Sequence, residues 1–170
     1  IYVTHDQEEA LAMSTKIAVM NHGQVVQVDP PRMIYEQPID NFVAAFVGQA
    51  NLLAGTIRAR TDSTVAVDIG AGNVVQVQAA GAAFQAGAAV WLSLRPEAVE
   101  LFPRGPEKVS VNDLDGRIIA AVYQGAFMEY EVAAAGTILK ARVANSKGET
   151  LYQRGDEIRL FFAPEAISCL

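Results

Sequence analysis

The pattern of hydrophobic and polar positions divides the chain into two regions. Up to about residue 50, short apolar runs alternate with stretches of helix-forming residues, whereas from residue 51 onward short alternating runs are separated by turns that contain glycine. The first region is predicted to contain strands at 1–5, 17–20 and 24–28 and three short helices, at 7–14, 31–37 and between Asp40 and Gly48. The second is predicted to be all β, with strands at 55–60, 64–69, 74–78 and 89–94.

Residue types at the ends of the predicted helices support these assignments. Asp6 and Asp40 are expected to act as N-caps, because a short carboxylate accepts hydrogen bonds from the free N–H groups of a first turn. Pro31 suits the first helical position, where no N–H is needed. Gly48 is expected to end the third helix in a left-handed conformation.

The β region contains a duplicated unit. Residues 84–98 align with residues 152–166 at a constant offset of 68, and they share Gln, Gly, Leu, Pro, Glu and Ala. Upstream, Gly55-Thr56-Ile57 corresponds to Gly116-Arg117-Ile118. One copy alone is near the lower size limit for a stable core, so the two copies are expected to pair into one barrel-like body. The alternative is that two unrelated hairpins share a Pro-Glu-Ala turn.

The predicted organisation is therefore a short α/β segment at residues 1–50 and a duplicated β domain at residues 51–170. The first segment has too little apolar area for a core of its own. Its apolar side chains are expected to pack against the β domain or a second copy of the chain. These side chains are Ile1, Val3, Ile17, Val19, Phe42 and Phe46.

Composition and charge narrow the range of possible functions. The 170 residues are 51% hydrophobic and 19% charged, which is typical of a globular protein, and no apolar run is long enough to span a bilayer. No signal-peptide pattern is visible. The single cysteine, Cys169, excludes an intramolecular disulfide and suits a reducing compartment. The net charge is −6 and the basic residues are scattered, so the phosphate backbone of a nucleic acid is disfavoured as a partner.

Few residues form a pattern that carries chemistry. The sequence has no glycine-rich phosphate loop, no Cys/His metal spacing and no Ser or Cys nucleophile paired with a base. His5 stands at the end of the first predicted strand, where a titratable imidazole can have a structural or a functional role. His22 lies beside Gly23 in a predicted turn and is interpreted as a solvated turn residue.

Residues 3–48, VTHDQEEALAMSTKIAVMNHGQVVQVDPPRMIYEQPIDNFVAAFVG, resemble the segment that follows the Walker B strand in ATP-binding subunits of ABC transporters. The similarity is to importers of the spermidine/putrescine, ferric-iron, sulfate and maltose type. Farther on, residues 92–101, LSLRPEAVEL, resemble the accessory domain of these subunits, a duplicated OB-like barrel called TOBE. Taken together, the two resemblances span nearly the whole chain.

The resemblance implies that His5 is the switch histidine, which contacts the γ-phosphate of ATP and helps to hold the attacking water, with Thr4 and Asp6 positioning the loop. The family's phosphate loop, signature motif and Walker B acid lie upstream of Thr-His-Asp, so the chain is expected to be the C-terminal part of a longer subunit. Pro30 stands where the family usually has a Ser or Thr cap, so the second helix is expected to be less well capped.

The implied function is that of a regulatory and dimerisation portion of an importer ATPase, of the polyamine or iron type. The full-length protein is expected to use ATP and Mg²⁺, whereas this chain alone is expected to have no cofactor and no ATPase activity. The implied partners are a second copy, transmembrane permease subunits and, indirectly, a substrate-binding protein, at the cytoplasmic face of a bacterial inner membrane.

The residues alone are also compatible with two other functions. The first is a free-standing barrel that binds a small oxyanion, for which Arg95, Ser146 and Lys147 are candidate donors. The second is an OB-like nucleic-acid binder, for which Phe84, Phe127 and Tyr130 are candidate stacking residues.

Overall fold

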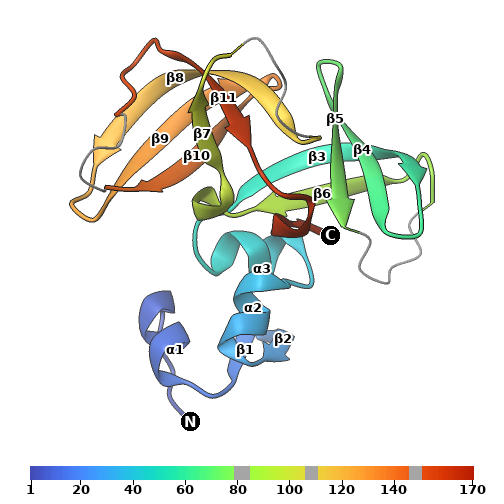
Figure 1. The fold of residues 1–170 in the computed structure, drawn as a ribbon. Helices are drawn as coiled ribbons and strands as arrows, with labels where there is room; N and C mark the ends of the chain where they lie inside the picture. The colour runs from blue at the N-terminus through green and yellow to red at the C-terminus, as the bar shows by residue number, and fades with distance from the viewer. Residues whose placement is uncertain (79–84, 106–110, 146–150) are drawn as a thin grey trace.

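The computed structural model describes residues 1–78, 85–105, 111–145 and 151–170. The helices are α1 (Gln7–Met13), α2 (Pro31–Glu36) and α3 (Asn41–Phe46), with 3-10 turns η1 (Pro96–Ala98) and η2 (Pro164–Ala166). The strands are β1 (Ile17–Asn21), β2 (Gln24–Asp29), β3 (Asn51–Arg60), β4 (Thr64–Gly70), β5 (Asn73–Gln78), β6 (Ala89–Leu94), β7 (Glu100–Pro103), β8 (Asp113–Tyr123), β9 (Phe127–Ala134), β10 (Thr137–Ala144), β11 (Glu157–Phe161) and β12 (Ile167–Cys169). The chain is mainly β, as predicted. In Figure 1 the helices and the β1–β2 hairpin lie below a β body formed by β3–β12.

The three helices begin and end as the local sequence predicts. Asp6 and Asp40 each accept a hydrogen bond from a backbone N–H of the first turn, at 3.1 and 2.8 Å. Pro31 is the first residue of α2, and Pro30 before it makes no side-chain capping bond. After α3, Gly48 has φ +81°, a left-handed conformation that glycine adopts without steric cost.

Residues 1–5 do not form the predicted strand. Their backbone is irregular, and the side chains of Ile1 and Val3 are exposed. A strand needs a neighbour to pair its N–H and C=O groups, and the described sheets place no strand beside this segment. The prediction that Ile1 and Val3 pack against the β body is therefore wrong within a single chain.

The helices and the hairpin form a small apolar cluster of their own. Val19, Ile34, Val43 and Val47 are buried together. Ile17 and Phe42 pack against this cluster only partly buried, together with Leu11, Val26 and Tyr35. Phe46 remains 43% exposed and stacks on Phe42 with 5.6 Å between ring centroids. Val19 is thus buried as expected, but by α2 and α3 rather than by the β body.

Each copy of the duplicated unit contributes its last strand to the sheet of the other copy. The first five-stranded sheet has the order β12-β6-β3-β4-β5 and the second has the order β7-β11-β8-β9-β10. Thus β7 and β12, the strands that follow η1 and η2, have changed places. The two 3-10 turns are separated by the predicted offset of 68 residues. The equivalent strands β3 and β8 each carry a bulge, at Ile57/Ala59 and at Ile118/Ala120. The predicted duplication is confirmed.

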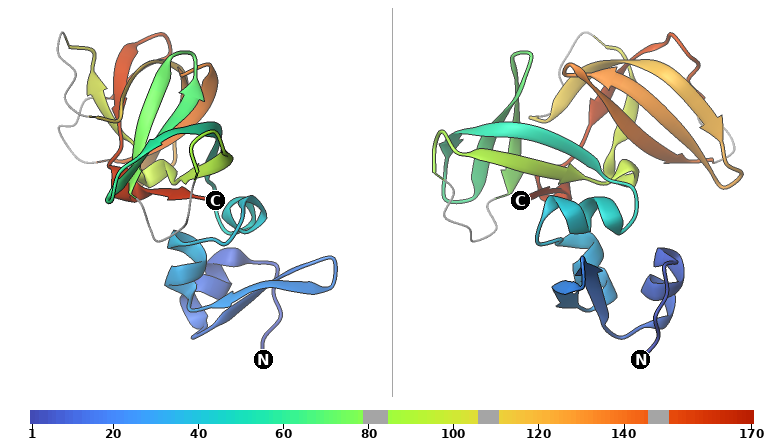
Figure 2. Two further views of the ribbon diagram at one scale, coloured as in Figure 1. Left: turned by 90° about the vertical axis from the view of Figure 1, so that its right-hand side faces the viewer. Right: turned by 180° about the vertical axis from the view of Figure 1, so that it is seen from behind.

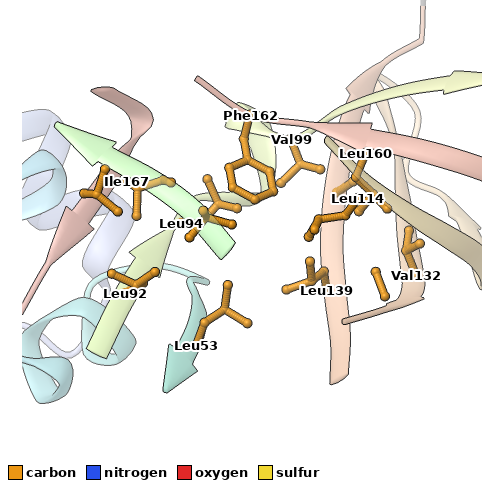
Figure 3. Packing of buried hydrophobic residues seen from close by; sticks show 14 of the residues in the cluster. Leu53, Leu92, Leu94, Val99, Leu114, Val132, Leu139, Leu160, Phe162 and Ile167 are labelled. Carbon is orange, nitrogen blue, oxygen red and sulfur yellow. The ribbon is translucent and has the colours of Figure 1, made fainter. Parts of the chain in front are cut away.

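The strand exchange gives the β body one hydrophobic core. Each sheet curls until its edge strands approach each other, β12 near β5 and β7 near β10; Figure 2 shows the two curled sheets from the side and from behind. In Figure 3, Leu53 and Leu92 of the first sheet face Leu139 of the second, and Phe162 lies near Val99 between them. All five belong to one buried cluster. Because the core is shared, neither copy is expected to be stable without the other.

Two equivalent glycines allow the sheets to curl this tightly. A Cβ on Gly116 would lie 2.5 Å from Leu160 Cδ1 and 2.7 Å from Val132 Cγ1, and one on Gly55 would lie 2.5 Å from Val67 Cγ1. These distances are shorter than carbon–carbon contact, so a methyl group requires the core to shift.

We therefore expect Gly116→Ala to lower the free energy of unfolding by about 2 kcal/mol. Gly105→Ala is the matched control, because a Cβ at Gly105 meets open space and its φ is not positive; it is expected to change stability by less than about 0.5 kcal/mol. Urea unfolding followed by circular dichroism measures both. Equal stabilities of the two variants would contradict this account of the core.

Candidate functional site

The loop before α1 presents His5 to the outside of the chain. Residues Thr4, His5 and Asp6 are called the histidine loop below. Thr4 Oγ1 accepts a hydrogen bond from the Asp6 N–H at 2.9 Å and donates one to Glu9 Oε2 at 3.0 Å. The Tyr2 hydroxyl also donates to the Glu9 carboxylate, at 3.0 Å. These bonds fix the backbone on both sides of His5, whose ring is exposed. The loop therefore presents the imidazole at the surface of the chain.

The other histidine lies in a turn. His22 lies at φ +47° in the β1–β2 turn and is exposed, as predicted for a turn residue. Within the described residues, no group of three or more His, Cys, Asp or Glu residues could hold a metal ion. A separate search of the same residues finds no helix with the length and hydropathy needed to cross a membrane.

A buried arginine joins the helices to the β body. Arg95 lies between β6 and η1, and its guanidinium donates to three backbone carbonyls: Tyr35 O at 2.7 Å, Ala44 O at 3.2 Å and Gln49 O at 3.4 Å. Its Cζ lies 4.0 Å from the centroid of the Tyr35 ring, over the ring face. Burial lowers the pKa of Arg95, although arginine remains charged in proteins. These carbonyls engage three of the five guanidinium N–H groups of Arg95.

Tyr35 extends the same contact to the β body. Its hydroxyl donates a hydrogen bond to the carboxylate of Glu97, in η1. Burial, followed by this hydrogen bond, raises the pKa of Tyr35 to about 12. Tyr35, Gly48, Arg95 and Glu97 are called the junction cluster below. A further link, from Ser168 Oγ to the carbonyl of Glu36 at 2.9 Å, ties β12 to the end of α2.

The junction cluster was not predicted as a unit, yet the sequence carries a signal for it. The aligned copies have Arg95 in the first unit and Ala163 at the equivalent position in the second. In the structure Arg95 reaches the carbonyls of Tyr35 and Ala44, which the short side chain of an alanine could not do.

Removing these bonds is expected to weaken the attachment of the helices. Arg95→Met should lower the free energy of unfolding by about 2 kcal/mol, because the buried carbonyl of Ala44 and the partly buried carbonyl of Tyr35 lose their donor, and Arg95→Lys should recover only part of the loss. The matched control is Arg32→Met, because Arg32 is exposed and pairs with Glu36 along the surface of α2; a change below about 0.5 kcal/mol is expected. Similar urea midpoints for Arg95→Met and Arg32→Met would refute a structural role for Arg95.

Two equivalent clefts lie beside the 3-10 turns. In one, η2 lies against the edge strand β5, and in the other, η1 lies against the edge strand β10. One, of about 500 Å³, lies beside η2, and its polar lining includes Gln78, Ser93 and Glu165. The other, of about 400 Å³, lies beside η1 and is lined by Glu100 and Arg142 among others. Glu97 lines both clefts, and each cleft also has an arginine in its lining, Arg95 in the first and Arg142 in the second. The predicted oxyanion donors Ser146 and Lys147 lie outside the described residues.

Two of the three candidate stacking residues, Tyr130 and Phe127, lie within the described residues. Tyr130 is fully buried, and its hydroxyl accepts a hydrogen bond from the backbone of Tyr152 at 3.3 Å. Phe127 is partly buried beneath Arg142, whose Cζ lies 4.4 Å from the ring centroid. Phe84 lies outside the described residues. The prediction that Tyr130 stacks on a base is therefore wrong.

Comparison with known proteins covers both regions of the chain. Residues 92–170 match the family model of the TOBE domain. The chain is similar to "Spermidine/putrescine import ATP-binding protein PotA" of Frankia alni (41% identity, 97% of this chain, 37% of that protein) and of Lawsonia intracellularis (38%, 93% and 44%), and to PotA 1 of Pseudomonas aeruginosa (38%, 100% and 45%). The chain belongs to the family of ABC import ATP-binding subunits.

The chain spans less than half of the length of each of these three relatives. A solved structure of the cytoplasmic molybdate-binding protein ModG, with molybdate bound, superposes with a TM-score of 0.61 at 17% identity. The superposition covers 70% of this chain and 94% of that chain. At this identity the likeness concerns the fold alone, and it confirms that the β body of this ABC subunit is a duplicated OB-like TOBE barrel.

Proposed function

We propose that the full-length protein is the ATPase subunit of an ABC importer and that His5 is its switch histidine. The observation that carries the proposal is the combination of an exposed imidazole on a braced loop with similarity to import ATP-binding proteins along the whole chain. An imidazole N–H can donate a hydrogen bond to a terminal phosphate oxygen, and this bond is lost when that phosphate leaves. His5 would thus report which nucleotide is bound.

ATP and Mg²⁺ enter this proposal as the substrate of the full-length protein. Residues 1–170 contain no glycine-rich phosphate loop, and the described residues offer no cluster of metal ligands. The residues that grip the nucleotide would lie in the part of the relatives that this chain does not span. The Thr4, Asp6 and Glu9 side chains would hold the backbone around His5 without contacting the phosphate.

The two separate apolar clusters support a division of the chain into two functional parts. Residues 1–50 would be the end of the ATP-binding domain, and residues 51–170 would be a regulatory TOBE domain. The partners would be a second copy of the subunit, a transmembrane permease and, indirectly, a substrate-binding protein. The protein would work at the cytoplasmic face of a bacterial inner membrane.

The names of the relatives favour a polyamine as the imported substrate. The test is uptake by membrane vesicles that contain the full-length subunit, its permease and its binding protein. We expect ATP-dependent uptake of radiolabelled putrescine or spermidine, with none of sulfate or ferric iron. Uptake of iron instead would overturn the substrate class, and an assembled complex without ATP-dependent transport of any of these would overturn the function.

A further inference from the structure

The residue that follows the histidine loop makes a long-range contact. Gln7 is the first residue of α1, and its Oε1 accepts a hydrogen bond from the backbone N–H of Gly48 at 2.7 Å. Helix α1 has no buried side chain, and Leu11 packs only partly buried against the small apolar cluster. The bond to Gly48 is therefore an important part of what fixes the orientation of α1 and of the loop before it.

The position of the Gly48 N–H is in turn set by the junction cluster. A Cβ at Gly48 would lie 3.0 Å from Tyr35 Cε2 and 3.5 Å from Arg95 Nη1, so the backbone lies directly against both side chains. Arg95 also donates to the carbonyl of the next residue, Gln49, at 3.4 Å. Any movement of Arg95 or Tyr35 would consequently move the donor that Gln7 holds.

The contacts continue into the TOBE domain. Tyr35 donates to the Glu97 carboxylate, and Glu97 is two residues from Arg95 in the same turn. A contiguous set of hydrogen bonds and packed groups therefore runs from the histidine loop through Gln7, Gly48 and Tyr35 to η1. Contiguity alone does not establish coupling, which requires a measured effect of one end on the other.

We propose that Gln7 is a positioning residue for His5: its side-chain oxygen holds the histidine loop to Gly48, and through the junction cluster to the TOBE domain. This inference rests on the proposed function of His5. A single directional bond at the start of a weakly packed helix sets the tilt of that helix, and a displacement of about 1 Å at a catalytic group can lower a rate by up to about 100-fold. The same bond gives the TOBE domain a route by which to alter ATP hydrolysis.

The experiment uses the full-length subunit and three variants at matched positions. Gln7→Met keeps the length of the side chain but removes the acceptor, Gln7→Glu restores an acceptor oxygen, and Gln24→Met makes the same change at an exposed glutamine of the β1–β2 hairpin. Steady-state ATP hydrolysis gives kcat and KM. Hydrogen–deuterium exchange of the η1 segment, with and without MgATP, reports whether nucleotide binding reaches the TOBE domain.

We expect Gln7→Met to lower kcat about tenfold with KM within about twofold of wild type, and to abolish the effect of MgATP on exchange in η1. Gln7→Glu and Gln24→Met should retain both properties. Combining Gln7→Met with Tyr35→Phe should cost no more than Gln7→Met alone, because both act on one connection.

Two results would overturn the inference: wild-type kcat and wild-type nucleotide-dependent exchange in Gln7→Met, or failure of Gln7→Glu to restore them. If Gln7→Met does not fold, Gln7→Ala takes its place with the same expectations. His5→Ala separates this inference from the proposed function. Full activity in His5→Ala would refute the role of His5 itself, whereas an inactive His5→Ala beside a normal Gln7→Met would refute only the connection through Gln7.

Discussion

Replacing His5 by alanine in the full-length subunit is expected to lower kcat for ATP hydrolysis by about 100-fold or more. This is the usual cost of removing one hydrogen-bond donor that faces charge developing in a transition state. The fold should tolerate the change, since the His5 ring is exposed and the bonds around it come from Thr4, Asp6 and Glu9. Steady-state hydrolysis and urea unfolding of the same preparations measure both properties.

The matched control is the other histidine. His22→Asn keeps a residue that tolerates positive φ in the β1–β2 turn, and it should leave kcat within about twofold of wild type. A His5→Ala protein as active as His22→Asn would show that His5 has no part in hydrolysis, and the proposed function would then lose its only catalytic residue in this chain.

The second large effect is expected at Asn112. This side chain is fully buried and bonds to both backbone groups of Gln76 on the edge strand β5: it accepts from the N–H at 2.6 Å and donates to the carbonyl at 2.8 Å. Asn51 makes the same pair of bonds to Lys140 on β10, at 2.7 and 2.8 Å. Each asparagine thus makes the two backbone hydrogen bonds that a neighbouring strand would make at the open edge of the other copy's sheet.

Asn112→Ala should lower the free energy of unfolding by about 3 kcal/mol, because the partly buried N–H and C=O of Gln76 both lose the partner that Asn112 supplies. Asn112→Asp should lose less, since it can still accept from the Gln76 N–H. Asn41→Ala, at an exposed position of α3, serves as the control and should change stability by less than about 0.5 kcal/mol. Urea unfolding measures the stability of each variant. If Asn112→Ala lost no more stability than Asn41→Ala, the proposed edge-capping role would be contradicted.

Local features of the fold could be predicted from the sequence, because their causes are local. Asp6 and Asp40 cap helices, and Gly48 ends one, by interactions within a few residues. The duplication was visible because both copies retain the Pro-Glu-Ala turn at one offset. The segment at residues 1–5 failed as a strand for a non-local reason, since a strand requires a partner and periodicity cannot say whether that partner is present.

The long-range features could not be predicted from patterns of single residues. The exchange of β7 and β12 depends on pairing between segments far apart in the chain, and neither short strand differs in pattern from one that stays in its own sheet. Asn51 and Asn112 were overlooked because one asparagine at a strand start is ordinary, although their equivalent places in both copies are a usable signal. For the candidate site, the sequence points to His5, whereas the bonds of Arg95 to backbone carbonyls of the helices depend on long-range packing that a local pattern cannot give.

The central claim is that this chain carries a nucleotide-sensing histidine and a TOBE domain but not the residues that grip the nucleotide. Calorimetric titration of MgATP into residues 1–170 and, in parallel, into the full-length subunit tests it most directly. The account predicts saturable binding to the full-length subunit and no measurable binding to residues 1–170. Micromolar binding of MgATP to residues 1–170 would contradict it.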